Sequence, residues 1–170
     1  MKLKNIKIKD FVKLQYTFLY DQAFEFVEPV NSFSGAECNF DALTFDEVTL
    51  VKNIMQDPSI ENMPMLYEIL YKKDFMEGRI MDFFQSKKWI DNKILEIIDI
   101  EEKLLFDMPD PKMIAAGAAN LERFGVLNTK IDLGVQFGKA PAEIGGWTYQ
   151  DVLLIKARNI EMNRIQKNYK

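Results

Sequence analysis

Apolar residues recur at intervals of three and four along most of the chain, which is the spacing of one face of an α-helix. From Phe11 this pattern predicts a helix that extends to about Val27 and carries a wide, strongly aromatic apolar arc. Asp10 fits the N-cap position, and Pro29 stands beyond the expected end. Lysine and apolar residues alternate over positions 2–8, which predicts a short edge strand or an extended arm.

Capping signals predict two more helices before residue 75. Thr44 and Glu47 form a capping box, in which each side chain satisfies the backbone amide of the other residue at the start of a helix over 45–56. Asn62 stands before Met-Pro and opens the next helix, which is expected to run to about Lys73 or past it. Both segments carry apolar residues on one side, so both are expected to pack on a core.

The middle of the chain reads as two helices separated by a break. Gly78 marks the first interruption, a helical stretch follows over 79–87, and Asp91 is expected to cap a second helix. Glu101 and Glu102 are expected to point outward from it. Its inward positions are Ile94, Ile97, Ile98 and Leu104.

Proline and glycine divide the last third of the chain. Pro111 begins a helix over 111–124 that is rich in small residues, so another backbone could approach it closely. Gly125 is expected to stop it, and Asn128 to cap a short helix that ends at Gly138.

A single helical turn at most is expected over 141–144, and Gly145-Gly146 is expected to act as a flexible joint. Thr148 then caps the last helix. The apolar stripe of that helix is thin and consists of Val152, Ile155, Asn159 or Ile160, and Ile165.

These segments predict an all-α fold, a compact bundle of six to eight mostly short helices with no strong set of strands. We expect a helical body over 1–146 with a short basic N-terminal arm. Residues 147–170 form a basic C-terminal helix or arm that is able to project from the body.

Composition agrees with a globular chain. Of the 170 residues, 48% are apolar and 28% are charged, which is enough to fill one core and cover it. No apolar run approaches the roughly 18 residues needed to cross a bilayer. The first ten residues lack the continuous apolar segment of a secretion signal. The expected location is therefore the cytoplasm in which the chain is made, or a particle packaged there.

Charge is unevenly distributed. Residues 1–9 and 152–170 each carry a net charge of +4, so the total of −4 leaves −12 for residues 10–151. Basic ends of this kind keep a chain soluble, fold back on an acidic body or contact an acidic protein neighbour. Nucleic acid is the least favoured partner, because the acidic body repels phosphate.

The residue types needed for most catalytic and metal sites are missing. Histidine is absent, which removes the commonest general base and the commonest transition-metal ligand. Cys38 is the only cysteine, so neither an internal disulfide nor a multi-cysteine metal site is possible. Carboxylate pairs such as Asp107 with Asp110 are explained by capping around a turn. The expectation is a protein that is not an enzyme and needs no cofactor, metal or small-molecule substrate.

One segment stands out, the run from Phe137 to Val152. It reads either as a loop with one helical turn in which Ile144 and Trp147 close the end of the core, or as a partner contact anchored by Trp147 and Tyr149. Large amphipathic aromatic residues favour the centres of interfaces.

The pattern F-G-x-x-P-x-E-I-x-x-W-T-Y-x-D-V in this segment, with an all-α body before it, resembles the C-terminal part of phage tail-assembly chaperones and related morphogenesis proteins. The opening fits as well, with a lysine-rich Ile-Lys-Ile-Lys-Asp-Phe, then Leu14-Gln-Tyr16, Gly35 and Leu43-Thr-Phe-Asp-Glu-Val48. The resemblance covers about half of the chain and leaves residues 60–110 largely unmatched.

The resemblance implies a non-enzymatic protein that binds tail or neck proteins during assembly in the host cytoplasm. The long basic helix to Lys170 departs from that pattern and is more typical of a permanent virion component, such as a helical head-to-tail adaptor or ring subunit. Partners are then viral structural proteins or further copies of the chain, without a membrane, and a host-interaction or regulatory role is the remote alternative. The residues expected to bind partners are Pro141, Glu143, Ile144, Trp147, Tyr149, Val152, Ile155, Lys156, Arg158 and Ile160.

Overall fold

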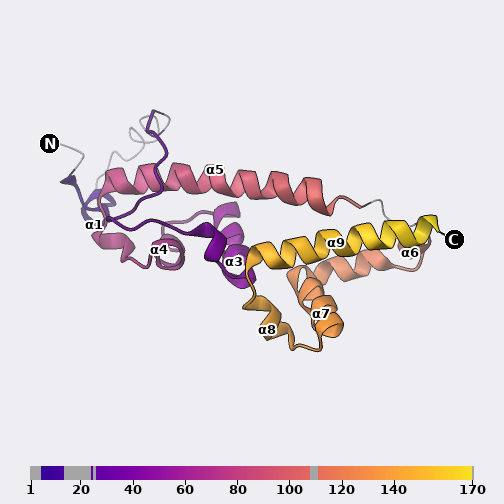
Figure 1. The fold of residues 1–170 in the computed structure, drawn as a ribbon. Helices are drawn as coiled ribbons and strands as arrows, with labels where there is room; N and C mark the ends of the chain where they lie inside the picture. The colour runs from indigo at the N-terminus through magenta and orange to yellow at the C-terminus, as the bar shows by residue number, and fades with distance from the viewer. Residues whose placement is uncertain (1–4, 14–23, 25, 108–110, 170) are drawn as a thin grey trace. The chain divides into compact units, whose positions relative to one another are not determined.

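The computed structural model describes residues 5–13, 24, 26–107 and 111–169 (Figure 1). Regular structure in these residues is helical, without a strand, and this confirms the all-α prediction. The α-helices are α1 (Ile8–Phe11), α3 (Phe45–Gln56), α4 (Met63–Tyr71), α5 (Ile80–Leu105), α6 (Pro111–Ala115), α7 (Val126–Phe137), α8 (Pro141–Gly145) and α9 (Tyr149–Asn168). Short 3-10 helices lie between them at η2 (Phe40–Ala42), η3 (Phe75–Glu77) and η4 (Ala118–Phe124).

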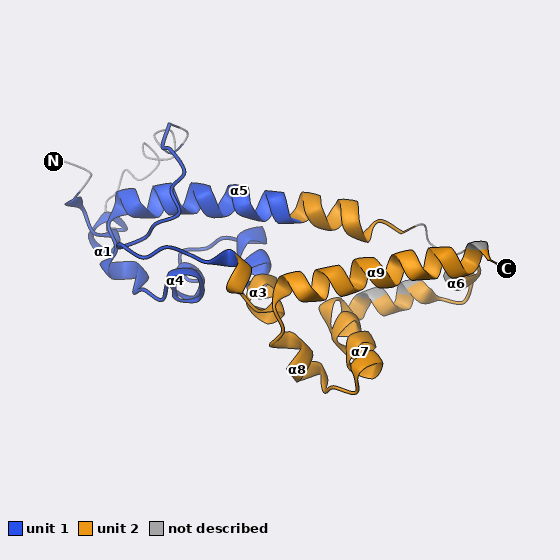
Figure 2. Ribbon diagram, viewed as in Figure 1, with its two compact units in different colours: residues 1–40, 50–97 blue, residues 41–49, 98–170 orange. Residues whose placement is uncertain are grey.

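The chain forms two compact units (Figure 2). Unit 1 consists of residues 1–40 and 50–97, and unit 2 of residues 41–49 and 98–170. Helices α3 and α5 each contribute one part to unit 1 and the other part to unit 2. The boundary expected at residue 146 lies inside unit 2, and the division into 1–146 and 147–170 stays a prediction.

Unit 1 is built around aromatic rings. Phe33 is fully buried, and its ring centroid lies 4.3 Å from that of Tyr67, which in turn lies 5.1 Å from that of Phe75. The Tyr67 hydroxyl is also buried and lies 2.8 Å from the hydroxyl of Ser86 on α5. Both groups are therefore satisfied within the core, which removes the usual cost of burying a hydroxyl.

The N-terminal segment is attached to the start of α5 in unit 1. The amide of Ile8 donates to the carbonyl of Gly78 over 2.9 Å, and the amide of Ile80 donates to the carbonyl of Ile6 over 2.9 Å. The segment forms an isolated bridge between Lys7 and Arg79, and the described residues contain two further isolated bridges, Phe33 with Ala36 and Thr44 with Thr148.

The helix expected from Phe11 to Val27 is described only in part. The structure shows a short α1 with Lys7 at its N-cap and Asp10 in its first turn, so the prediction of Asp10 as the N-cap is wrong. Residues 14–23 and 25 of the expected helix lie outside the described residues.

Two other helix predictions are corrected. The expected break before Asp91 is absent, because α5 is continuous, and Asp91 pairs with Lys87 at 2.7 Å as an i,i+4 ion pair. The single helix expected over 111–124 is instead α6 followed by η4. The two helices are divided at Gly117, whose φ of +88° is a backbone conformation that residues other than glycine rarely adopt.

Several predicted ends are confirmed by their hydrogen bonds. The amide of Thr44 donates to the Glu47 carboxylate over 2.9 Å, and the amide of Glu47 donates to the Thr44 hydroxyl over 3.2 Å. The Thr148 hydroxyl caps α9, and Gly138 ends α7 in the left-handed conformation. The cap predicted at Asn128 is wrong, because α7 begins two residues earlier.

Candidate interaction surface

The segment that stood out in the sequence builds the base of α9 in unit 2. The amide of Phe45 donates to the carbonyl of Trp147 over 2.8 Å, and the amide of Tyr149 donates to the carbonyl of Leu43 over 3.0 Å. The rings of Phe45 and Tyr149 are stacked, with centroids 6.3 Å apart. The start of α9 is therefore joined by backbone bonds and ring packing to a segment more than 100 residues earlier.

Several predicted partner-binding residues are covered by the protein itself. Ile144 and Val152 are fully buried, and Tyr149 is 7% exposed. Burial raises the pKa of Tyr149, and so does the hydrogen bond that its hydroxyl donates to Glu101 over 2.5 Å. Trp147 is half-buried, with its ring edge against Phe137. The buried side chains are not accessible to a partner in this conformation. They fit the first of the two alternatives drawn from the sequence, in which the segment closes the end of the core.

The glycine joint predicted before α9 has a different role. Gly145 is buried in α8, and a Cβ atom there would lie 2.2 Å from a carboxylate oxygen of Asp46. Asp46 is held in this place by an ion pair with Lys130. A side chain at residue 145 would therefore have to displace the Asp46 carboxylate. The structure places Gly145 in helix α8 and leaves Gly146 outside a helix, so a flexible joint between α8 and α9 stays a prediction for Gly146 alone.

Three predicted partner-binding residues are exposed, namely Pro141, Glu143 and Arg158. The Glu143 carboxylate accepts a hydrogen bond from the amide of Ala140 over 2.9 Å and pairs with Lys139 at 3.1 Å. These contacts lower the pKa of Glu143 and stabilise the first turn of α8. Partner contact by the three exposed residues stays a prediction.

The remaining predicted residues lie on α9 and are half-buried, namely Ile155, Lys156 and Ile160. The Lys156 ammonium donates to the Thr129 hydroxyl of α7 over 3.2 Å. Lys156 and Ile160 also line a shallow hollow of about 160 Å³ between α7 and α9. These two residues therefore join α9 to α7 within unit 2.

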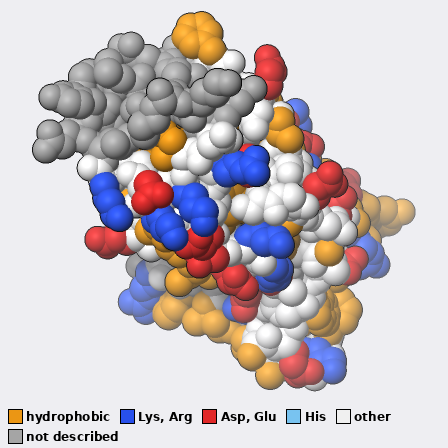
Figure 3. Space-filling view, turned by 90° about the vertical axis from the view of Figure 1, so that its left-hand side faces the viewer, with side chains coloured by type: hydrophobic (Ala, Val, Ile, Leu, Met, Phe, Trp, Pro, Cys, Tyr) orange, Lys and Arg blue, Asp and Glu red, His pale blue; other side chains and the backbone are white. Residues whose placement is uncertain are grey.

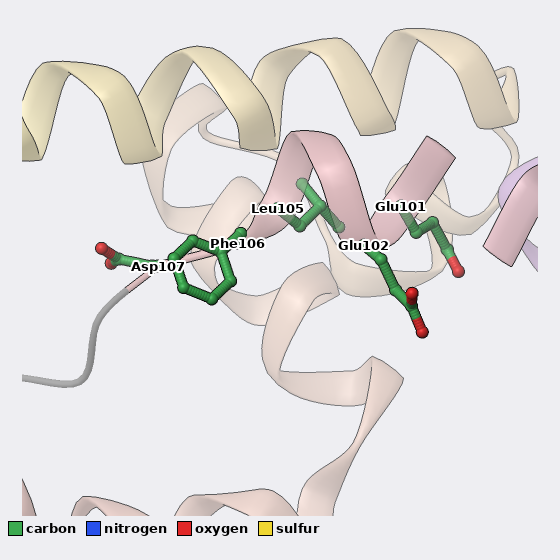
Figure 4. Close-up of a pocket in the computed structure, with 5 residues that line it drawn as sticks. All are labelled: Glu101, Glu102, Leu105, Phe106 and Asp107. Atoms are coloured by element: carbon green, nitrogen blue, oxygen red, sulfur yellow. The ribbon is translucent and has the colours of Figure 1, made fainter. Parts of the chain in front are cut away.

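A wider hollow of about 620 Å³ lies at the end of α5 (Figure 4). Its lining consists of Glu101, Glu102, Leu105, Phe106 and Asp107. Figure 4 shows the Asp107 carboxylate pointing away from those of the two glutamates. Paired-carboxylate catalysis needs two such groups facing one substrate, and Asp107 does not face either glutamate in this hollow.

Cys38 is buried in unit 1. Its backbone is held by the Asn31 side chain, which donates to the Cys38 carbonyl over 2.8 Å and accepts from its amide over 3.0 Å. Burial raises the pKa of the thiol to about 11, so the reactive thiolate is scarce at neutral pH. Tyr71 lies close by and is also buried.

An exposed apolar stripe on α7 was not predicted from the sequence. Leu127, Ile131 and Val135 follow one another at intervals of four and are between 43% and 81% exposed. The opposite side of α7 carries Leu133, which is buried. We call the three exposed residues the α7 face. The spacing is visible in the sequence, but spacing alone does not say which side of a helix the rest of the fold covers.

A second stripe lies on α9, where Leu154, Met162, Ile165 and Tyr169 are 39% to 92% exposed. We call these four residues the α9 face; Arg158 lies among them. Ile165 was predicted to share one thin apolar stripe with Val152, but the structure buries Val152 and leaves Ile165 exposed. The inward side of α9 begins with Tyr149, Val152 and Leu153, which are buried.

Charges of both signs are interspersed with hydrophobic side chains on the face drawn in Figure 3. The described residues include no group of three or more carboxylate or cysteine side chains placed to hold a metal ion. Among the helices that the structure describes, none is long and apolar enough to cross a membrane.

Comparison with known proteins gives no relative. No protein-family model matches the chain, and no similar curated protein or solved structure is found.

Proposed function

We propose that this chain is a non-catalytic assembly protein of a bacteriophage virion, which binds tail or neck proteins while the particle is built. The observation that carries the proposal is the pair of exposed apolar stripes in unit 2, the α7 face and the α9 face. Exposed apolar patches on a small domain mark sites of protein contact. The phage-like pattern from Phe137 to Val152 adds support, since it forms the base from which α9 extends.

The structure changes which residues this proposal relies on. Positions that carry the pattern of the segment, such as Ile144 and Val152, lie in the core of unit 2. In this proposal the pattern specifies the fold of unit 2, while recognition belongs to exposed residues of α7 and α9. Arg158 is the one predicted partner-binding residue that also lies on the α9 face.

A tagged chain, isolated from infected cells during assembly, tests the proposal. We expect a defined tail or neck protein to be bound, and we expect the binding to fall at least tenfold for Leu154→Lys. Leu95→Lys is the matched control, because Leu95 is equally exposed but lies in unit 1. Absence of any virion protein from the isolated material, or equal loss with both variants, contradicts the proposal.

The second candidate, a permanent adaptor or ring subunit, is favoured by the length of α9, which continues to Asn168. Mass spectrometry of purified particles separates the two roles. A transient chaperone is absent from finished virions, whereas an adaptor is present in a fixed number of copies.

A further inference from the structure

The α7 face and the α9 face point away from each other within unit 2. Helix α7 meets α9 through the side of Thr129 and Gln136, whose partners on α9 are Lys156 and Asn159. At about 100° per residue, the centre of this contacting side lies roughly 150° from the α7 face. The same count on α9 separates the side of Lys156 and Asn159 from the α9 face by roughly 130°. The packed pair therefore carries one apolar stripe on each outer side.

The size of the two faces is the next observation. At the exposed fractions given above, the α7 face presents on the order of 300 Å² of apolar surface and the α9 face on the order of 450 Å², each comparable with the largest apolar patch of a typical monomer. A stable interface buries about 1,600 Å² in total, of which somewhat more than half is apolar. Neither face alone supplies that amount, but the two together come close to it.

We propose that the α7 face of one copy of this chain docks on the α9 face of a second copy. The apolar residues of the α7 face are spaced at four, and those of the α9 face follow the same side of the helix at eight, three and four, with Arg158 in the widest gap. Side chains at such positions can interlock when two helices pack side by side. One contact of this kind covers the α7 face of the first copy and the α9 face of the second. The first copy then keeps a free α9 face and the second a free α7 face, until the series closes.

An interface between unlike surfaces has a geometric consequence. Because the two joined faces are different, the contact is head to tail, and repeated contacts give a ring or an open chain. This proposal concerns the purified chain alone and stands apart from the phage function proposed above.

Two variants that each disable one face test the docking by complementation. Ile131→Glu with Val135→Glu disables the α7 face, and Leu154→Glu with Ile165→Glu disables the α9 face. Light scattering coupled to size exclusion should give the wild type a mass that rises with concentration to at least twice 19.8 kDa. Each variant alone should remain at the mass of one chain. An equimolar mixture should form a one-to-one dimer, through the face that each variant retains.

A wild-type chain that stays monomeric at high concentration overturns the proposal, and so does a variant that dimerises alone, which would mean that like faces pair. Circular dichroism must show unchanged helix content. If a double variant does not fold, the single changes Val135→Lys and Leu154→Lys replace it, at side chains that are 81% and 61% exposed. Leu95→Glu in unit 1 is the matched control and should associate like the wild type.

Discussion

The two units differ in how completely they cover their own apolar side chains. Of the described residues, 18 buried apolar side chains belong to unit 1 and eight to unit 2. Large apolar side chains that stay exposed are distributed in the opposite way, with seven in unit 1 and 14 in unit 2. Unit 1 thus covers most of its large apolar side chains, whereas unit 2 has a small core at the start of α9 and leaves many apolar side chains exposed.

The difference indicates which unit of the chain gains more from contact with another protein. A unit that buries its aromatic residues against each other gains little from a partner. A unit that leaves the α7 face and the α9 face in water gains from covering them, since burial of apolar surface is favourable by about 25 cal/mol per Å². The comparison can be tested unit by unit, because each unit contains one of the two tryptophans, Trp89 in unit 1 and Trp147 in unit 2.

The largest expected effect is in the core of unit 1. Phe33→Ala removes a fully buried ring that packs on Tyr67, and it should lower the free energy of unfolding by about 3–5 kcal/mol. Urea unfolding, followed by the fluorescence of Trp89 in a Trp147→Phe background, measures the loss. Val135→Ala is the control in unit 2 and should change stability by less than about 0.5 kcal/mol. A loss below 1 kcal/mol for Phe33→Ala would show that the aromatic core is not tightly packed.

The second effect compares one glycine in each unit. A Cβ atom on Gly78 would lie 2.1 Å from the buried ring of Phe33, which has no space to move. A Cβ atom on Gly145 would instead meet the Asp46 carboxylate, whose side chain is half-exposed and can rotate away. We expect Gly78→Ala to cost about 1–3 kcal/mol and Gly145→Ala less than about 1 kcal/mol, mainly the lost ion pair.

Urea unfolding measures the two losses of stability, with Trp89 fluorescence as the probe for Gly78→Ala and Trp147 fluorescence as the probe for Gly145→Ala. Equal losses in the two variants would mean that the base of α8 is as rigid as the core of unit 1.

A smaller effect is expected from the hydrogen bond between α9 and the end of α5. Tyr149→Phe removes the hydroxyl that donates to Glu101 and should destabilise unit 2 by about 1 kcal/mol. The readout is urea unfolding followed by Trp147 fluorescence in a Trp89→Phe background. Tyr169→Phe is the matched control, because Tyr169 is 92% exposed and its change should leave stability unaltered. If both variants behave alike, the Glu101 contact contributes nothing measurable.

The smallest effect concerns pH and unit 1. Lys7 and Lys9 both bind the exposed Glu77 carboxylate and lower its pKa from 4.5 to about 2. A depressed pKa stabilises the folded state at pH values above 4.5, and this stabilisation is lost as the pH falls towards 2. The stability difference between wild type and Glu77→Gln should therefore be largest above pH 5 and vanish near pH 2.

Salt provides the control for that measurement. Because the three groups are exposed, 1 M salt should screen their interaction and reduce the difference at every pH. A difference that persists in high salt would mean that Glu77 stabilises the protein in some other way.

The sequence predicted the helical class and several helix ends because these depend on neighbouring residues. Thr44 and Glu47 satisfy each other within one turn, and Gly138 provides the left-handed ending that a helix stop requires. The continuity of α5 was missed because Asp91 resembles a cap in sequence, whereas in the helix it pairs with Lys87 one turn earlier.

The interaction surface was harder to predict, because it depends on which side of a helix the rest of the fold covers. Val152 and Ile165 lie on the same helix and look alike in sequence, yet one is fully buried and the other is 47% exposed. The closeness of Gly145 to Asp46 joins residues 99 positions apart, and no local pattern shows it. The segment from Phe137 to Val152 stood out in the sequence, and its residues Ile144 and Val152 are buried in unit 2.

The attachment of α9 to residues 43–45 also has a consequence for biosynthesis. Unit 1 has all of its residues once position 97 has been made, but Leu43, Phe45 and Val48 belong to unit 2 and are covered together with residues as late as Leu153. At about 5–20 residues per second, the ribosome needs a further 3–10 s or so to supply them. During that interval the nascent chain presents an unfinished apolar segment to proteases and folding helpers. A translation stall or a truncation between residues 97 and 153 should therefore shorten the lifetime of the chain, because Leu43, Phe45 and Val48 then stay uncovered.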